Sequence, residues 1–284
     1  MNRLDSAKRT AVLTALMEGC SIRSTVRMTG VAKKTVMRLL VEAGAVADAF
    51  QSRTLVNLPC KRIQVDELWS FCYAKAKNVT PEMAEGHPGA GSVWIWAAIC
   101  ADTKLVPSWC VGNRDEESGV AFLTDVARRM TGRIQLSSDA FPTYSKAVEE
   151  VFGTDVDYGQ IIKIFKGGTV ADARYSPAAC VGARRVAVMG DPDMDHVSTS
   201  YVERQNLSLR MGVRRLTRLT NAFSRKIENH AAAVALYYFG YNFVRSHRSL
   251  GGITPAMAAG VTDRVWEVSD LVALLEKAES PKAA

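Results

Sequence analysis

The first part of the chain shows a hydrophobic periodicity of about 3.6 residues, which predicts three helices in quick succession. The apolar face of the first helix consists of Val12, Leu13, Leu16 and Met17. Ser21 is placed to cap a second helix that is followed by Gly30, and Lys33 opens a third, basic helix. A short helix, a glycine-containing turn and a basic helix form the helix-turn-helix plan. We therefore expect an all-α DNA-binding domain of this type over residues 1–56, with a three-helix bundle that binds no ligand as the alternative.

Strand-type composition begins after Asn57-Leu58-Pro59. The expected elements are, in order, strands at Arg62–Tyr73, Val93–Ala101 and Lys104–Val111, a helix at Glu116–Met130, a strand at Arg133–Ser138, a helix at Tyr144–Phe152 and a strand at Val156–Phe165. A three-stranded meander followed by helix, strand, helix and strand is the order of an RNase H-like α/β fold with a mixed sheet. We expect this catalytic domain over residues 57–250.

The pattern breaks over residues 167–197, where glycines, two prolines and the turn Asp191-Pro192-Asp193 predict an insertion with a small hairpin through Val181 to Val188. Helical periodicity returns at Ser198 and continues to about Asn242, with an interruption around Thr217 to Asn221. Residues 251–284 are expected to form a C-terminal tail with a short helix.

The composition is that of a globular protein, because 48% of the 284 residues are hydrophobic and 23% are charged. No run approaches the roughly 18 apolar residues that a membrane span requires, and no signal-peptide pattern follows the start. The six cysteines form neither CxxC pairs nor clusters with metal-ligand spacing, so zinc and a disulfide framework are not expected. We expect a cytoplasmic protein with reduced thiols and no membrane partner, associated with the bacterial nucleoid when it is on DNA.

Positive charge is concentrated in two regions of the chain. The total of 36 Lys and Arg against 29 Asp and Glu gives a net charge of +7. Residues 1–50 contain 8 basic and 4 acidic residues, and residues 203–248 contain 9 and 2, so the rest of the chain is slightly acidic. Basic regions on either side of an acidic centre suit DNA contact around an acidic catalytic site.

Three carboxylates are singled out by their positions in these elements. Asp66 lies in the middle of the apolar strand pattern Ile63-Gln64-Val65-Asp66-Glu67-Leu68-Trp69, where a buried, unpaired charge would cost several kcal/mol. Glu67 should point to the opposite face of the strand and be solvated or structural. Asp139 follows the fourth strand and Glu203 opens the next long helix. Helix capping is the alternative role for Asp139, and a first-turn acid favoured by the helix dipole is the alternative for Glu203.

An RNase H-like sheet would bring these three carboxylates together, because its first strand, the end of its fourth strand and a following helix lie side by side. Phosphoryl transfer between DNA strands uses two divalent ions about 3.5–4 Å apart. Mg²⁺ takes oxygen ligands, and a few protein carboxylates are enough to hold it. We therefore predict that Asp66, Asp139 and Glu203 are the catalytic and metal-binding residues, with two Mg²⁺ ions that Mn²⁺ can replace.

The strings Val65-Asp66-Glu67-Leu68-Trp69-Ser70-Phe71, Ser198-Thr199-Ser200-Tyr201-Val202-Glu203-Arg204-Gln205-Asn206 and Arg214–Ser224 resemble insertion-sequence transposases of the IS1 type. The likeness covers nearly all of residues 61–260. It implies a DDE enzyme that cuts and joins DNA at the terminal inverted repeats of a mobile element, with Asp66, Asp139 and Glu203 at the family's DDE positions. It also implies a homo-oligomer, at least a dimer on DNA, because two element ends must meet in one complex with target DNA. Founding members carry a zinc finger ahead of the helix-turn-helix, and this sequence has no cysteine cluster for one.

The residues expected to contact double-stranded DNA are Lys33, Lys34 and Arg38 in the third helix and Arg204, Arg210, Arg214, Arg215 and Arg218 in the second basic region. A solvated helix face is the alternative for the second group. His230 and His247 are interpreted as packing or phosphate-contact residues.

Several rival functions stay open. One is a catalytically inactive, transposase-derived DNA-binding regulator, another is an RNase H-like nuclease that does not join strands, and a third is an α/β protein with an unrelated ligand. A serine or tyrosine recombinase would need a nucleophilic side chain, for which Tyr201 is the candidate near the basic helix.

Overall fold

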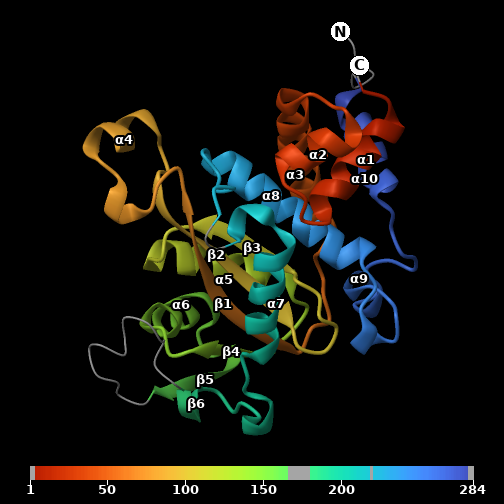
Figure 1. The fold of residues 1–284 in the computed structure, drawn as a ribbon. Coiled ribbons are helices and arrows are strands. Elements are labelled where there is room, and N and C mark those ends of the chain that lie inside the picture. Colours follow the sequence, from red (N-terminus) through yellow and green to blue (C-terminus); the bar gives the residue numbers. More distant parts are fainter. Residues whose placement is uncertain (1–3, 166–179, 218–219, 281–284) are drawn as a thin grey trace.

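A mixed six-stranded β-sheet forms the centre of the molecule, and helices cover both of its faces (Figure 1). The computed structural model describes residues 4–165, 180–217 and 220–280. The strands are β1 (Arg62–Cys72), β2 (Gly91–Cys100), β3 (Ser108–Gly112), β4 (Ile134–Asp139), β5 (Val156–Phe165) and β6 (Cys180–Met189). Their order across the sheet is β3-β2-β1-β4-β5-β6.

The pairing of the strands confirms the predicted mixed sheet. β1, β2 and β3 form an antiparallel meander, whereas β4 lies parallel to β1 and β5 lies parallel to β4. β3 is shorter than predicted and begins at Ser108, directly after Pro107. Proline has no N–H to donate to a strand ladder, so pairing starts after it.

The predicted hairpin through Val181 to Val188 is wrong. Residues Cys180–Met189 form one continuous strand, β6, which pairs antiparallel with β5. The outer edge of β5 would otherwise present unpaired N–H and C=O groups, and β6 satisfies them. Part of the predicted insertion therefore belongs to the sheet, while residues 166–179 lie outside the described residues.

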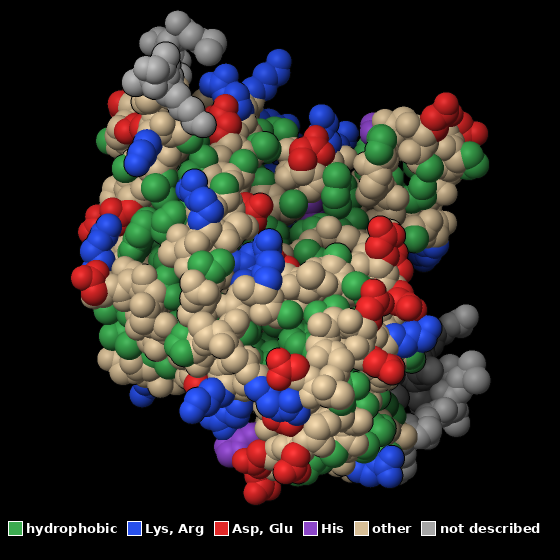
Figure 2. Space-filling view, turned by 180° about the vertical axis from the view of Figure 1, so that it is seen from behind, with side chains coloured by type: hydrophobic (Ala, Val, Ile, Leu, Met, Phe, Trp, Pro, Cys, Tyr) green, Lys and Arg blue, Asp and Glu red, His purple; other side chains and the backbone are tan. Residues whose placement is uncertain are grey.

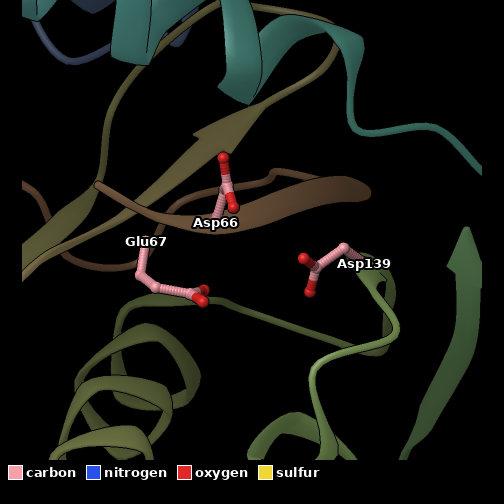
Figure 3. A group of neighbouring side chains, drawn as sticks. All are labelled: Asp66, Glu67 and Asp139. Atoms are coloured by element: carbon pink, nitrogen blue, oxygen red, sulfur yellow. The ribbon is translucent and has the colours of Figure 1, made fainter. Parts of the chain in front are cut away.

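Different helices pack against the two faces of the sheet. α5 (Glu116–Arg129) and α6 (Pro142–Phe152) lie on one face, where Phe122 and Tyr144 pack against the fully buried Trp96 of β2. α7 (Ser200–Gly212) lies on the other face, over β1 (Figures 1 and 3). Side chains of β1 therefore alternate between the layer of α5 and α6 and the layer that contains α7.

The three predicted N-terminal helices are present as α1 (Ser6–Met17), α2 (Ile22–Thr29) and α3 (Lys33–Thr54). Ser21 Oγ caps α2 by accepting a hydrogen bond from the Ser24 N–H at 3.0 Å. Gly30 ends α2 in the left-handed backbone conformation, with φ of 69°, which glycine adopts without steric cost. The local capping signals in the sequence thus placed these helices well.

These N-terminal helices pack against the C-terminal part of the chain (Figure 1). α3 contacts α8 (Ile227–Phe239), and α1 and α3 contact α10 (Val268–Glu279). The approach of α3 to α8 is close at Gly44, where a Cβ atom would lie 2.6 Å from Ala232. The division of the chain into domains near residues 56 and 250 stays a prediction.

Shorter helical segments complete the described chain. The C-terminal tail holds α9 (Pro255–Ala258) as well as α10, where one short helix was predicted. α4 (Pro81–Gly86) lies between β1 and β2, and a π-helical turn, Gly240–Val244, continues α8. Single 3₁₀ turns occur at Ala76–Asn78, Met194–His196, Arg214–Leu216 and Arg248–Leu250. None of the helices in the described part of the chain combines the length and apolar character needed to cross a membrane.

Candidate active site

Two aspartates stand at the same level of neighbouring strands. β1 and β4 pair in parallel with Gln64 opposite Ser137, so Asp66 and Asp139, two residues further along each strand, are level with one another. The side chains of Asp66, Glu67 and Asp139 converge (Figure 3), and one carboxylate oxygen of each lies within 4.8 Å of those of the other two. We call these three residues the acidic cluster.

Asp139 is the last residue of β4 and shapes the turn that follows. Its Oδ1 accepts a hydrogen bond from the Phe141 N–H at 3.0 Å. The N-cap residue of α6 is Phe141, whose side chain makes no capping hydrogen bond. Asp139 therefore lies two residues before the N-cap of α6, and its carboxylate belongs to the acidic cluster.

The carboxylates of the acidic cluster repel one another. Burial raises the pKa of Asp66 to about 7, and the neighbouring charges of Glu67 and Asp139 add to the shift. Burial also raises the pKa of Glu67, although the hydrogen bond from Arg114 opposes it. A divalent cation would reverse such shifts, because it favours the charged form of every carboxylate around it.

Asn206 of α7 reaches β1 and holds Asp66. Its Nδ2 donates a hydrogen bond to Asp66 Oδ2 at 2.8 Å, and the residue is 5% exposed. Its Oδ1 is buried and has no hydrogen-bond partner among the described residues, an arrangement that costs about 1–3 kcal/mol. A buried amide oxygen beside carboxylates adds to the hard oxygen donors that Mg²⁺ and Mn²⁺ prefer. The acidic cluster and Asn206 thus fit a divalent metal ion.

Sequence reasoning gave Asn206 no role, although a signal for it existed. Asn206 follows Glu203 by three residues, so the two side chains lie on the same face of a helix. A helix that presents Glu203 toward β1 must therefore present Asn206 there as well.

The first turn of α7 is tied to the sheet by a buried glutamine. Gln64 of β1 is 2% exposed, and its Oε1 accepts hydrogen bonds from the Tyr201 and Val202 N–H groups at 2.8 and 3.2 Å. These N–H groups have no partners within the helix, so Gln64 acts as a cap supplied by the neighbouring strand. It also fixes the position of Glu203, one residue after Val202.

Glu203 lies in the first turn of α7, as predicted, beside a lysine of β5. Its Oε1 accepts hydrogen bonds from Lys163 Nζ at 2.8 Å and from Thr199 Oγ1 at 2.6 Å. In the described part of the chain, the group of three carboxylates within 4.8 Å of one another consists of Asp66, Glu67 and Asp139 and does not include Glu203. Its role as a third metal ligand stays a prediction.

Glu67 is buried and hydrogen-bonded rather than solvated. Its side chain leaves β1 on the face opposite to that of Asp66, and its carboxylate turns toward Asp139 (Figure 3). The side chain is 2% exposed. Glu67 Oε1 accepts hydrogen bonds from Arg114 at 2.6 and 2.8 Å, and its Oε2 accepts one from Tyr144 at 3.0 Å. The Arg114 guanidinium also lies over the rings of Trp94 and Phe141, at 4.6 and 3.9 Å from their centroids. These contacts satisfy the buried carboxylate.

Replacing Arg114 with methionine is expected to lower the free energy of unfolding by about 2 kcal/mol. The substitution leaves Glu67 buried without its cationic partner. The effect is moderate because the Arg114 side chain is 38% exposed, so water screens the ion pair. Urea unfolding of the single variant and of the double variant Arg114→Met/Glu67→Gln measures the effect. The double variant should recover part of the loss, and a single variant as stable as the natural protein would contradict this role.

The basic residues expected to contact DNA have different exposures. The side chains of Lys33, Lys34 and Arg38 are exposed at the start of α3, and those of Arg204 and Arg214 are exposed in and after α7. These five are accessible to a phosphate backbone. Their contact with DNA stays a prediction.

The remaining arginines make contacts within the protein or lie outside the described residues. Arg210 donates a hydrogen bond to the Trp69 carbonyl at 2.9 Å, and Arg215 donates one to Ser224 Oγ at 3.2 Å. Arg218 lies outside the described residues. Arg210 and Arg215 are partly buried, so part of each side chain serves the fold.

His230 is a packing residue. It is 1% exposed, and burial together with the positive charge of Arg215 lowers its pKa to about 4. The ring is therefore neutral at pH 7 and offers no charge to a phosphate. Its Nδ1 lies 3.1 Å from Ser224 Oγ.

Neither a family model nor a curated protein matches the sequence. A chain of a simian T-cell lymphotropic virus intasome in complex with PP2A regulatory subunit B56 gamma is similar at 11% identity and a TM-score of 0.34, over 93% of this chain and 73% of that one. A chain of a piggyBac transposase synaptic complex with hairpin DNA is similar at 10% identity and a TM-score of 0.37, over 98% and 73%. A chain of the Mos1 strand transfer complex has 12% identity and a TM-score of 0.25, over 83% and 77%. Similarity at this level assigns neither a family nor an activity.

Proposed function

We propose that the chain is a DDE-type DNA transposase of the IS1 type, with an RNase H-like catalytic domain. The observation that carries this proposal is the placement of Asp66 and Asp139 at one level of adjacent parallel strands, with the helix of Glu203 tied across β1. The burial and mutual repulsion of the acidic cluster support a cation there, as does the Asn206 oxygen that lacks a hydrogen-bond partner among the described residues. The resemblance of the strings around Asp66 and Glu203 to IS1-type transposases supports the narrower assignment.

Asp66, Asp139 and Glu203 would hold the metal ions, and Asn206 would orient Asp66 through its amide. When bound, Mg²⁺ or Mn²⁺ supplies the positive charge that phosphoryl transfer between DNA strands requires. Glu67, held by hydrogen bonds from Arg114 and Tyr144, would keep its carboxylate buried and close to that of Asp139. In this proposal no side chain forms a covalent bond to DNA.

The proposed substrate is double-stranded DNA, at the ends of a mobile element and at a target site. The exposed basic start of α3 would contact the element end, with α2 and α3 as a helix-turn-helix. Arg204 and Arg214 would contact phosphates next to the acidic cluster. Joining two ends requires at least a dimer on DNA, and the proposed location is the cytoplasm, on the nucleoid.

The experiment that tests this function uses the full chain, Mg²⁺ and DNA that carries the sequences flanking its own gene. The expected products are nicks at the element ends and molecules in which those ends are joined to a second DNA. End binding without nicking would instead indicate an inactive regulator, and nicking without joining would indicate a nuclease. Absence of both binding and nicking would defeat the proposal.

A further inference from the structure

Lys163 places a positive charge at the edge of the acidic cluster. Its Nζ donates a hydrogen bond to Glu203 Oε1 at 2.8 Å, and the two side chains are 36% and 41% exposed. The strand register explains why this lysine reaches the site. Ile161 of β5 pairs with Asp139 of β4, and Lys163 follows two residues later, on the same face of β5 as Ile161.

The ammonium of Lys163 is within electrostatic reach of all three predicted metal ligands. Burial lowers the pKa of Lys163, but the hydrogen bond and charge of Glu203 outweigh it, and the charges of Asp66 and Asp139 act in the same direction. The pKa of Lys163 therefore lies above its ordinary value, and the side chain is a cation at any physiological pH. A second cation at Glu203 would have to compete with it.

We propose that Lys163 is a positioning residue. Its ammonium binds the Glu203 carboxylate when no metal is bound, and a divalent metal ion that binds Glu203 displaces it. The inference rests on the proposed function, because it takes Glu203 as a metal ligand. Glu203 Oε1 already accepts two hydrogen bonds, from Lys163 and Thr199, so a metal ion that uses this oxygen must displace a donor. The lysine can leave, because its flexible side chain is partly exposed and water can solvate the freed ammonium.

This arrangement keeps Glu203 ordered before metal binds. An unpaired Glu203 would add a further negative charge near Asp66 and Asp139. Burial and the charges of Glu67 and Asp139 already raise the pKa of Asp66. Lys163 offsets that charge at the cost of weaker metal binding. The same residue thus lowers the affinity for metal and preserves the geometry that metal binding needs.

The test measures Mn²⁺ binding to the full chain without DNA, by electron paramagnetic resonance of the free ion. Lys163→Met is expected to tighten Mn²⁺ binding about threefold to tenfold, because an exposed ion pair and its competing charge are removed. Lys146→Met is the matched control, since Lys146 pairs with Glu116 at 3.0 Å and neither residue belongs to the site. The control should bind Mn²⁺ as the natural protein does.

A second pair of variants separates competition at Glu203 from general repulsion. In a Glu203→Gln background, Lys163→Met should tighten Mn²⁺ binding by less than half the fold-change seen in the natural background. Thermal unfolding confirms that each variant is folded, and Lys163→Gln replaces the methionine variant if that one is not. An unchanged affinity in Lys163→Met, or an equal gain in both backgrounds, would overturn the inference and leave the proposed function standing. Absence of Mn²⁺ binding in every variant would instead defeat the metal site itself and the inference with it.

Discussion

Asp66→Asn is expected to reduce Mg²⁺-dependent strand cleavage by about 10³-fold or more, and to make the metal-free protein more stable above pH 7. The loss of activity follows from removing a carboxylate ligand, since metal ions supply several kcal/mol of transition-state stabilisation. The gain in stability follows from removing a buried charge that Glu67 and Asp139 repel. A catalytic group that costs stability is common in active sites.

The pH dependence of this effect has a definite sign. The pKa of Asp66 rises from 3.8 to about 7 on folding, so between these values the folded state binds more protons than the unfolded state. The free energy of unfolding that Asp66 contributes is therefore fully present below pH 4 and is lost as the pH rises to about 7. Asparagine does not ionise, so the advantage of the variant should be near zero at pH 4 and reach at most about 4 kcal/mol above pH 7.

Urea unfolding at a series of pH values, without metal, measures the stability, and cleavage of end-containing DNA measures the activity. Asp263→Asn is a suitable control, because Asp263 is exposed and the same atoms are exchanged. A variant that cleaves at the natural rate would remove Asp66 from the catalytic set. A stability difference that does not change with pH would contradict the burial of a repelled carboxylate.

Glu203→Gln is expected to lower the cleavage rate about 10³-fold with little change in stability. Glu67→Gln is expected to lower the stability with little change in the cleavage rate. Glu203 is 41% exposed, and its ion pair with Lys163 is worth at most about 1 kcal/mol. Glu67 is buried and accepts hydrogen bonds from Arg114 and Tyr144, so its replacement should lower the free energy of unfolding by about 1–3 kcal/mol. Below its melting temperature the Glu67 variant should keep cleavage within about tenfold.

The comparison decides which glutamate completes the metal site. Glu67 lies nearer to Asp66 and Asp139 in the structure, whereas Glu203 occupies the predicted position on the helix. Glu149→Gln, an exposed glutamate of α6, controls for the chemical change. If Glu67→Gln lost cleavage and Glu203→Gln retained it, the third ligand would be Glu67 and the helix α7 would only orient the site.

The convergence of Asp66 and Asp139 could be predicted from the sequence, because it depends on the order and direction of two strands. Parallel neighbours bring equivalent positions to one level, and the apolar patterns of both strands were clear. Asn206 and Arg114 could not be placed in this way. Their contacts with Asp66 and Glu67 join segments far apart in the chain, and no local pattern encodes them.

Errors in the predicted fold occurred where local signals were ambiguous. A small hairpin was predicted through Val181 to Val188, yet Cys180–Met189 is one continuous strand that pairs with the edge of β5. Glycine inside a helix costs about 1 kcal/mol relative to alanine, so Gly44 argues against a helix at this position when only neighbouring residues are considered. Its contact with Ala232 of α8 gives the physical reason for a residue without a side chain at this position.

The close contact between Gly44 of α3 and Ala232 of α8 affects the distance along DNA between the sequence that α3 would recognise and the phosphodiester that would be cut. One continuous hydrophobic core runs from Val36 of α3 to Val65 of β1, so packed side chains connect the two regions. For a duplex bound at the basic start of α3, the phosphodiester that reaches Asp66 would therefore lie at a fixed number of base pairs from the bound sequence. Inserting one base pair between those points would turn the scissile phosphate by about 34°. The number of base pairs between the recognised sequence and the cleaved phosphodiester would then be set by the distance between α3 and Asp66 in the folded protein.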